Sequence, residues 1–250
     1  MARRHSNRRR RRGRFSFLLK LLCFLVIIGA AFAALTLFFN MDHIIITGNE
    51  HYTQEEILEA SGLKQGDNLY LMNKYSVKEK IFSKLPFVEE VSINRRLPDT
   101  LLIDLRECHG AAGIQSGSET WIISSKGKIL LQVDEVPAGC AHVIGLELEQ
   151  PVLGAQAVFA GENEYRSGVL MTLLECARER GMNTGLDNID LTDETSLNFT
   201  YLNRFAVKMP WTADVDYKLE CLATVVNYLE INEVGTINLM TDGKASFIPS

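Results

Sequence analysis

The stretch from His43 to Met72, HIIITGNEHYTQEEILEASGLKQGDNLYLM, sets the fold of the first half of the chain. It opens on four β-branched residues at 44–47, which favour a strand. Thr53 precedes Glu56 by three positions, and this capping-box spacing predicts the start of a helix. Gly62 predicts the end of that helix. The stretch therefore predicts a strand, a turn and a helix in quick succession.

The residues that follow predict a second helix and a hairpin. Ser76 and Glu79 repeat the capping-box spacing and predict a second helix start. Apolar residues alternate in 91–97 and again in 101–105, on either side of a Pro-Asp turn, which predicts two antiparallel strands. Residues 42–107 therefore have the order β-α-α-β-β. Each helix is too short to be stable alone and must pack on the sheet.

Charge is divided sharply along the 250 residues. Nine of the 26 Lys and Arg residues lie in 1–40, which contain no Asp or Glu. The remaining 17 basic residues stand against all 31 acidic ones, a net charge of −14 that the overall −5 conceals. An acidic remainder disfavours nucleic acid or an anionic wall polymer as the main ligand.

A membrane anchor accounts for the first 40 residues. Leu21–Phe39 has no charged residue, and about 20 apolar residues cross the hydrocarbon core. We predict a basic cytoplasmic tail at 1–20 and a transmembrane helix at 21–40, with the rest of the chain outside the cytoplasm. A cleaved signal peptide fits less well because apolar sequence continues to Phe39. A twin-arginine signal or a nucleic-acid arm also fits less well than a tail attracted to anionic lipid.

Residues 110–250 predict a second domain, mixed α+β with an antiparallel sheet, so the fold class of the chain is α+β. The segment HGAAGIQSGSE reads either as a flexible linker or as a strand at 111–114. Asp242-Gly243 predicts a two-residue type I′ turn that closes the domain. Helices are predicted at 167–180 and 214–229, and strands at 121–123, 129–131, 143–145, 189–191, 197–201, 205–209, 236–240 and 244–248.

Several segments carry a resemblance to a known family. The opening stretch and LPFVEEVSINRRLPDTLLIDLRE resemble the start and the closing hairpin of a POTRA domain, which we assign to 41–109. The basic tail, one span, one POTRA domain and a C-terminal β domain at 110–250 together resemble the cell-division family FtsQ/DivIB. WIISSKGKILLQV and GTINLMTDGKASFIP also resemble that family's β domain. A family proline is missing at Arg106-Glu107-Cys108-His109, which leaves the geometry of the domain junction open.

This resemblance implies a divisome scaffold without catalytic activity or a cofactor. Such proteins bind FtsB/DivIC-type and FtsL-type division proteins at the septum and thereby help control the septal peptidoglycan synthase. The expected contacts are therefore those proteins, the synthase complex indirectly, and membrane lipid, but not nucleic acid.

The last predicted strand is the candidate partner-binding site. In the resembled family the FtsB-type partner adds to this strand, and a terminal strand can leave a sheet edge whose N–H and C=O groups pair with an incoming strand. The alternative is that Phe247 and Ala245 only face the core while Lys244 and Ser246 face water, which still leaves the backbone edge available. The candidate residues are Thr241, Lys244, Ala245, Ser246, Phe247 and Ile248.

The sequence contains no signature of a catalytic or metal site. HExxH, Walker A and GxSxG motifs are absent, and the pairs Cys108-His109 and Cys140-x-His142 lack an established zinc spacing. Cys176 and Cys221 lie in amphipathic helical patterns, so we expect buried thiols there, and the sequence does not decide whether the four cysteines beyond the span pair. One alternative function is a membrane-anchored cell-wall enzyme with the POTRA domain as a spacer. It would require a pocket lined by several of Asp187, Asp190, His142 and Glu147.

Overall fold

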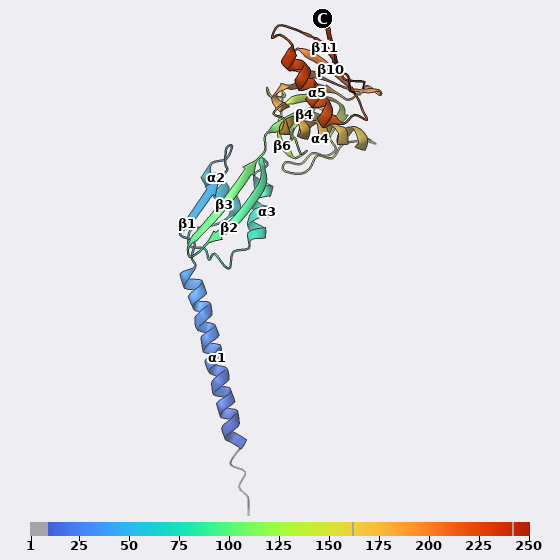
Figure 1. Cartoon of the computed structure of the whole chain (residues 1–250). Helices are drawn as coiled ribbons and strands as arrows, with labels where there is room; N and C mark the ends of the chain where they lie inside the picture. The colour runs from blue at the N-terminus through green and yellow to red at the C-terminus, as the bar shows by residue number, and fades with distance from the viewer. Residues whose placement is uncertain (1–9, 162, 242) are drawn as a thin grey trace, which may run out of the picture.

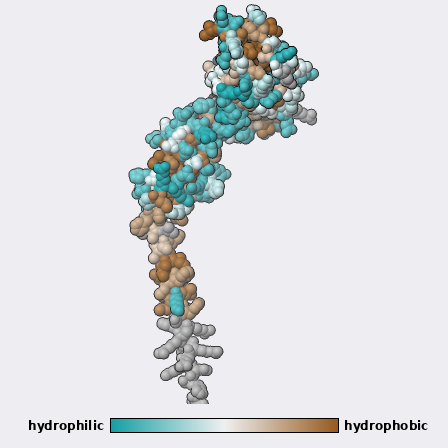
Figure 2. Space-filling view, viewed as in Figure 1, coloured by the Kyte–Doolittle hydropathy of each residue, from teal (hydrophilic) through white to brown (hydrophobic). Residues whose placement is uncertain are grey.

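The computed structural model describes residues 10–161, 163–241 and 243–250, so residues 1–9 of the predicted tail and Asp242 of the predicted turn lie outside the described residues. The first described element is helix α1 (Arg10–Phe38), which extends away from two folded domains (Figure 1). Within the described ranges one helix is long and apolar enough to cross a membrane, and it contains Phe17–Ala34. Figure 2 shows this helix as a hydrophobic stem below two largely hydrophilic domains.

A three-stranded domain follows α1 and has the predicted β-α-α-β-β order (Figure 1). Its central strand is β3, which pairs in parallel with β1 and antiparallel with β2. Both helices pack on the sheet and bury an aliphatic core between the two layers. The elements are β1 (His43–Thr47), α2 (Gln54–Ser61), α3 (Lys74–Lys84), β2 (Val88–Arg96) and β3 (Thr100–Glu107).

Local capping signals explain where these helices begin. The Thr53–Glu56 capping box is confirmed, and Gly62 ends α2 with a φ of 69°. The second capping box, predicted at Ser76, is wrong. Asn73 caps α3 instead, because its side-chain oxygen accepts hydrogen bonds from the N–H groups of Tyr75 and Ser76 at 3.0 and 3.4 Å.

The C-terminal domain is built on one sheet of nine strands in the order β12-β11-β10-β9-β8-β7-β4-β5-β6. Helices α4 (Glu164–Glu179) and α5 (Val215–Tyr228) pack against each other and supply much of the apolar core. The strands are β4 (Gly110–Ser116), β5 (Glu119–Ser124), β6 (Ile129–Val133), β7 (Ala141–Glu147), β8 (Leu186–Asp190), β9 (Ser196–Tyr201), β10 (Phe205–Pro210), β11 (Gly235–Asn238) and β12 (Ser246–Pro249), and a short 3₁₀ turn lies at Asn183–Gly185.

This sheet combines the expected antiparallel pairs with three parallel ones. The pairs β4–β7, β7–β8 and β10–β11 are parallel. Helix α4 lies between β7 and β8 in the chain, and α5 lies between β10 and β11, so each helix is the crossover that a parallel pair needs. The sheet is therefore mixed, and its two helices are connections as well as cover.

The segment rich in small residues is strand β4, not a linker. Ala111, Ala112 and Ile114 are buried in it. A Cβ on Gly113 would lie 2.4 Å from Val136 Cγ2, so a larger residue there would collide with its neighbour. Small residues stand here because other chain segments pack closely, and not because the backbone is free.

The closing hairpin differs from the predicted type I′ hairpin. The register pairs Asn238 with Ser246, whereas a two-residue Asp-Gly loop would pair Asn238 with Phe247. The strands are also shorter than predicted, and residues 239–245 connect them. The Lys244 N–H donates to the Thr241 carbonyl at 3.4 Å within this connection. The prediction therefore failed in register by one residue.

Two lysines join the domains where the family proline is missing. Only Cys108 and His109 separate β3 from β4. From the C-terminal domain, Lys128 Nζ donates to the Val88 carbonyl at 2.6 Å and lies 5.3 Å from the centre of the Phe82 ring. Lys126 Nζ lies 2.5 Å from Glu89 Oε1. Burial is the main cause that lowers the pKa of Lys128. The junction is thus held by bonds from side chains as well as by the chain itself.

Candidate partner-binding site

Strand β12 forms one edge of the nine-stranded sheet. It pairs with β11 on one side, and in the described part of the chain no strand pairs with its other side. In Figure 1 this edge lies at the end of the molecule remote from α1, beside the C-terminus. The edge position that the sequence suggested for this strand is therefore found in the structure.

The hydrogen-bond pattern shows which backbone groups lie on the open side. The N–H groups of Gly235 and Leu239 donate to Arg204 and Lys208 of the β10 segment, so odd-numbered residues of β11 bond to β10. On the other side, the Ser250 N–H donates to the Val234 carbonyl at 3.0 Å, so even-numbered residues bond β11 to β12. In an antiparallel pair these positions alternate.

It follows that Phe247, which lies opposite Ile237, turns its N–H and C=O away from β11 toward the open edge. Extended by one residue beyond the Asn238–Ser246 pair into the connection, the same alternation predicts that the N–H of Ala245 also points outward. Pro249 has no N–H, which limits pairing at the C-terminal end of the edge. An incoming strand would thus meet Ala245 and Phe247 first.

The side chains of β12 alternate between core and solvent. Phe247 is half-buried, and its ring centre lies 6.1 Å from that of Phe205 in an edge-to-face arrangement. Ser246 is exposed, and Ile248 is 56% exposed. Ala245 is also exposed, so the alternative in which it faces the core does not hold for this residue. The inward Phe247 anchors the strand while its backbone stays accessible.

The remaining predicted residues, Thr241 and Lys244, are exposed in the connection before β12. Lys218 of α5 forms a hydrogen bond with that connection. The Lys218 side chain is buried, and its Nζ donates to the Thr241 carbonyl at 3.1 Å. Sequence reasoning missed Lys218 because a lysine beside the apolar stripe of a helix ordinarily reads as exposed. The hydrogen bond to the distant Thr241 carbonyl gives its buried ammonium an acceptor.

Gly235 is the second residue that sequence reasoning missed. A Cβ there would lie 2.2 Å from the Ile248 carbonyl oxygen and 2.7 Å from Phe247 Cε2. The position therefore requires glycine for β12 to pair closely with β11. The signal available in the sequence was a lone glycine at a strand end, which marks a close approach of another backbone.

Exposed apolar side chains lie near the same edge. Ile231 is 90% exposed and Val234 is 50% exposed, and Val234 is tied to the C-terminal Ser250 by the hydrogen bond described above. Figure 2 shows hydrophobic residues gathered at this end of the C-terminal domain. The open backbone edge is therefore accompanied by apolar surface.

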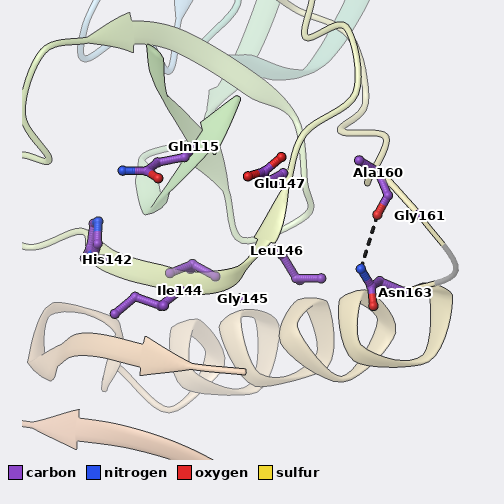
Figure 3. Close-up of a pocket in the computed structure, with 10 residues that line it drawn as sticks. Gln115, His142, Ile144, Gly145, Leu146, Glu147, Ala160, Gly161 and Asn163 are labelled. Carbon is purple, nitrogen blue, oxygen red and sulfur yellow. Dashed lines mark hydrogen bonds between the residues drawn. The ribbon is translucent and has the colours of Figure 1, made fainter. Parts of the chain in front are cut away.

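The pocket required by the enzyme alternative is only partly assembled. His142 and Glu147 line a surface hollow of about 660 Å³ along β7, and Figure 3 shows them separated along that strand by Ile144 and Gly145. Asp187 and Asp190 do not line it. Instead, Asp187 accepts a hydrogen bond from the Asn203 N–H, and Asp190 accepts two from Thr192.

Asp193, a third carboxylate in this region, also accepts hydrogen bonds from backbone N–H groups. It accepts hydrogen bonds from Thr195 and Ser196, and those from the Thr195 N–H and hydroxyl are the main causes that lower its pKa. Among the described residues no group of three or more His, Cys, Asp or Glu side chains is placed to hold a metal ion. All five cysteines are free thiols.

Comparison with known proteins first shows which kind of domain follows α1. Residues 39–107, the three-stranded domain with its approach from α1, match the model of the POTRA domain of FtsQ type. The chain is thus a POTRA-domain protein with an apolar N-terminal helix and a β-rich C-terminal domain.

Relatives that align with most of the chain indicate a more specific class of protein. The chain is 25% identical to the cell division protein DivIB of Clostridium acetobutylicum over 82% of this chain and 81% of that protein. It is 24% identical to DivIB of Clostridium botulinum strain Hall over 96% and 93% of the two chains. It is 29% identical to the cell division protein FtsQ of Corynebacterium glutamicum over 43% and 48%. The chain thus carries a POTRA domain of FtsQ type and is similar over most of its length to DivIB cell-division proteins.

Proposed function

We propose that this protein is a divisome scaffold that binds FtsB/DivIC-type and FtsL-type proteins at the septum and so helps control septal peptidoglycan synthesis. It acts by docking and carries out no reaction of its own. Its relatives are cell-division proteins, which supports a role in the division machinery. The finer assignment of partners comes from the family resemblance of the terminal strand.

The observation that carries the proposal is the open edge of β12. Phe247 holds the strand to the core by its side chain and turns its peptide N–H and C=O outward. A partner segment that adds as a further strand completes these hydrogen bonds, and Ile248 and Val234 offer it apolar contact. Thr241, Lys244, Ala245 and Ser246 are exposed along the approach to the same edge.

The proposal also places the protein in the membrane. Helix α1 is a single span, the arginine-rich end lies in the cytoplasm, and both domains lie outside it, because basic residues stay on the cytoplasmic side. A fluorescent fusion supports the septal assignment if it gathers at midcell. An even envelope signal through the whole cell cycle contradicts it.

The edge is tested by Ala245→Pro, which removes the N–H that the extended alternation predicts to point outward and which leaves the core untouched because Ala245 is exposed. The full chain is purified in detergent with its host's DivIC-type protein, and the dissociation constant is measured. We expect Ala245→Pro to weaken binding about tenfold, which corresponds to ~1.4 kcal/mol or about one hydrogen bond. The matched control is Ala245→Val, which keeps the N–H and should bind as the wild type does.

Proline at Ser246 is a poorer test because the register turns the Ser246 N–H inward, toward β11. Circular dichroism and the melting temperature establish that each variant is folded. A folded Ala245→Pro protein with wild-type affinity would contradict strand addition at this edge.

A further inference from the structure

The POTRA domain is fastened directly to the end of α1. Only Phe39 and Asn40 separate that helix from Met41, which is fully buried in the POTRA core. The Met41 N–H donates to the Asp67 carbonyl at 2.8 Å, and the Leu69 N–H donates to the Phe39 carbonyl at 2.9 Å. The chain leaving α1 is therefore bonded to the loop between α2 and α3, and no free linker intervenes.

That loop exposes large apolar and aromatic side chains beside the helix exit. Leu71 is 65% exposed, and Tyr75, at the start of α3, is 85% exposed. Tyr70 is 44% exposed, and its ring lies edge-on to Phe39 with the ring centres 4.9 Å apart. Such exposure is unfavourable in water, but Tyr is enriched where a protein meets the headgroup layer of a membrane.

The turn between β2 and β3 lies at the same end of the domain (Figure 1). The N–H groups of Asp42 and His43, just beyond α1, both donate to the Asp99 carbonyl of this turn. The turn carries Leu97, which is 57% exposed. The Arg95 guanidinium links the turn to the loop, because it lies 5.8 Å from the centre of the Tyr70 ring and donates to the Met72 carbonyl at 2.9 Å.

The height of these residues above the membrane follows from α1. The apolar window Phe17–Ala34 is followed by four more residues of helix, which advance about 6 Å to Phe38. The headgroup layer on each side of a ~30 Å hydrocarbon core is roughly 5–7 Å thick. Residues bonded to Phe39 therefore lie at or within the headgroup layer, whether the hydrocarbon ends at Ala34 or at residue 40, the end of the predicted span.

We propose that Tyr70, Leu71, Tyr75 and Leu97 form an interfacial foot that rests in the headgroup layer of the same bilayer that α1 crosses. This inference rests on the single span of the proposed function. The foot and α1 together fix the tilt of the POTRA sheet on the membrane, which a single helix alone does not.

The charges around the foot suit a lipid surface. Arg96 is exposed on the turn next to Leu97 and adds positive charge toward lipid phosphates. Three acids are close by: Asp42 is exposed just beyond α1, and Asp67 and Asp99 are engaged in their own turns. Asp67 accepts from the Lys64 N–H at 2.9 Å, and Asp99 accepts from the Thr100 hydroxyl at 2.9 Å.

Quenching by brominated lipid tests the foot in the full chain. Tryptophan is introduced at Tyr75, the membrane end of α3, or at exposed Lys84, the other end of the same helix and about 14 Å away. Each variant is reconstituted in phosphatidylcholine vesicles with and without bromine on the acyl chains. The native Trp121 and Trp211 give the same background in every variant.

We expect Tyr75→Trp to lose at least about half of the added fluorescence in brominated vesicles and Lys84→Trp to lose almost none. A third variant, Phe24→Trp in α1, reports on the span itself. Quenching of Phe24→Trp without quenching of Tyr75→Trp would overturn the foot and leave the span standing. Absence of quenching in Phe24→Trp would overturn both, and equal quenching at Tyr75 and Lys84 would overturn the foot because the domain then lies flat.

Discussion

The two edges of the nine-stranded sheet are treated differently by the chain. At β6 the Ile129 N–H donates to the Ala155 carbonyl at 2.9 Å, and the Gly154 N–H donates to the Ile129 carbonyl at 2.8 Å. A bridge between Lys128 and Gln156 extends this cover. At β12, in the part of the chain that the structure describes, no segment covers the outer side.

Open edges are a liability that folded proteins ordinarily cover or blunt. The cover at β6 lies beside the POTRA junction, where Lys126 and Lys128 already hold the two domains together. The edge at β12 lies at the far end, where a partner has access (Figure 1). The difference teaches that one edge belongs to the internal architecture of the protein and the other is available for assembly.

The largest effect is expected from breaking the open edge itself. Gly235→Ala places a Cβ 2.2 Å from the Ile248 carbonyl oxygen and forces β12 away from β11. We expect partner binding to be lost and the free energy of unfolding to fall by about 1–3 kcal/mol, as overpacking does. The control is Gly168→Ala in α4, where nothing lies within 4 Å and stability should rise by up to about 1 kcal/mol. Urea unfolding and the partner dissociation constant measure both effects, and intact binding by Gly235→Ala would contradict the account.

A change at the covered side should leave assembly intact. Lys128→Met removes the ammonium that donates to the Val88 carbonyl at 2.6 Å. We expect the free energy of unfolding to fall by about 1.5–3 kcal/mol, the range for a charged hydrogen bond, while the partner dissociation constant stays within about twofold of the wild type. Loss of binding in a folded Lys128→Met protein would show that the two edges are not independent.

The smallest effect concerns the helices behind the sheet. Arg180, at the end of α4, donates to Asp216 of α5 at 2.6 and 2.8 Å, and this hydrogen-bonded pair lowers the pKa of Asp216. A lowered carboxyl pKa stabilises the fold above the unfolded value near 3.8, and that stability is lost as the pH falls through the folded value. Asp216→Asn should therefore melt slightly below the wild type at pH 7, and the difference should vanish in strong acid. A difference that persists unchanged at low pH would exclude this pair as its cause.

Local signals made the POTRA half predictable from sequence. Thr53 marks the start of α2 and Gly62 marks its end. Both ends were predictable because capping depends on residues within a few positions of the helix end. The same reasoning failed at Ser76, since Asn73 offered a side-chain oxygen three residues earlier. Where two capping residues compete, sequence spacing alone does not choose between them.

The C-terminal half depends on contacts between distant residues. The parallel pair β10–β11 could not be foreseen because it depends on how α5 returns the chain to the sheet. The register of β12 differed by one residue from that of an Asp-Gly turn, and a shift of one residue moves side chains to the other face. The anchor Lys218–Thr241 joins residues 23 positions apart and leaves no local pattern. The sequence predicted that a strand ends the domain, but it did not predict the contacts of Lys218 and Gly235 that hold this strand in place.

Amide hydrogen exchange at Phe247 tests the central claim most directly. In the free full-length protein the amide of Phe247 should exchange rapidly, because its N–H faces the open edge, while those of Ser246 and Ile248 should be protected by β11. A saturating DivIC-type partner should then slow exchange at Phe247 by at least about tenfold, the effect of about 1.4 kcal/mol of added protection. Unchanged, rapid exchange at Phe247 in the bound complex would contradict strand addition at β12.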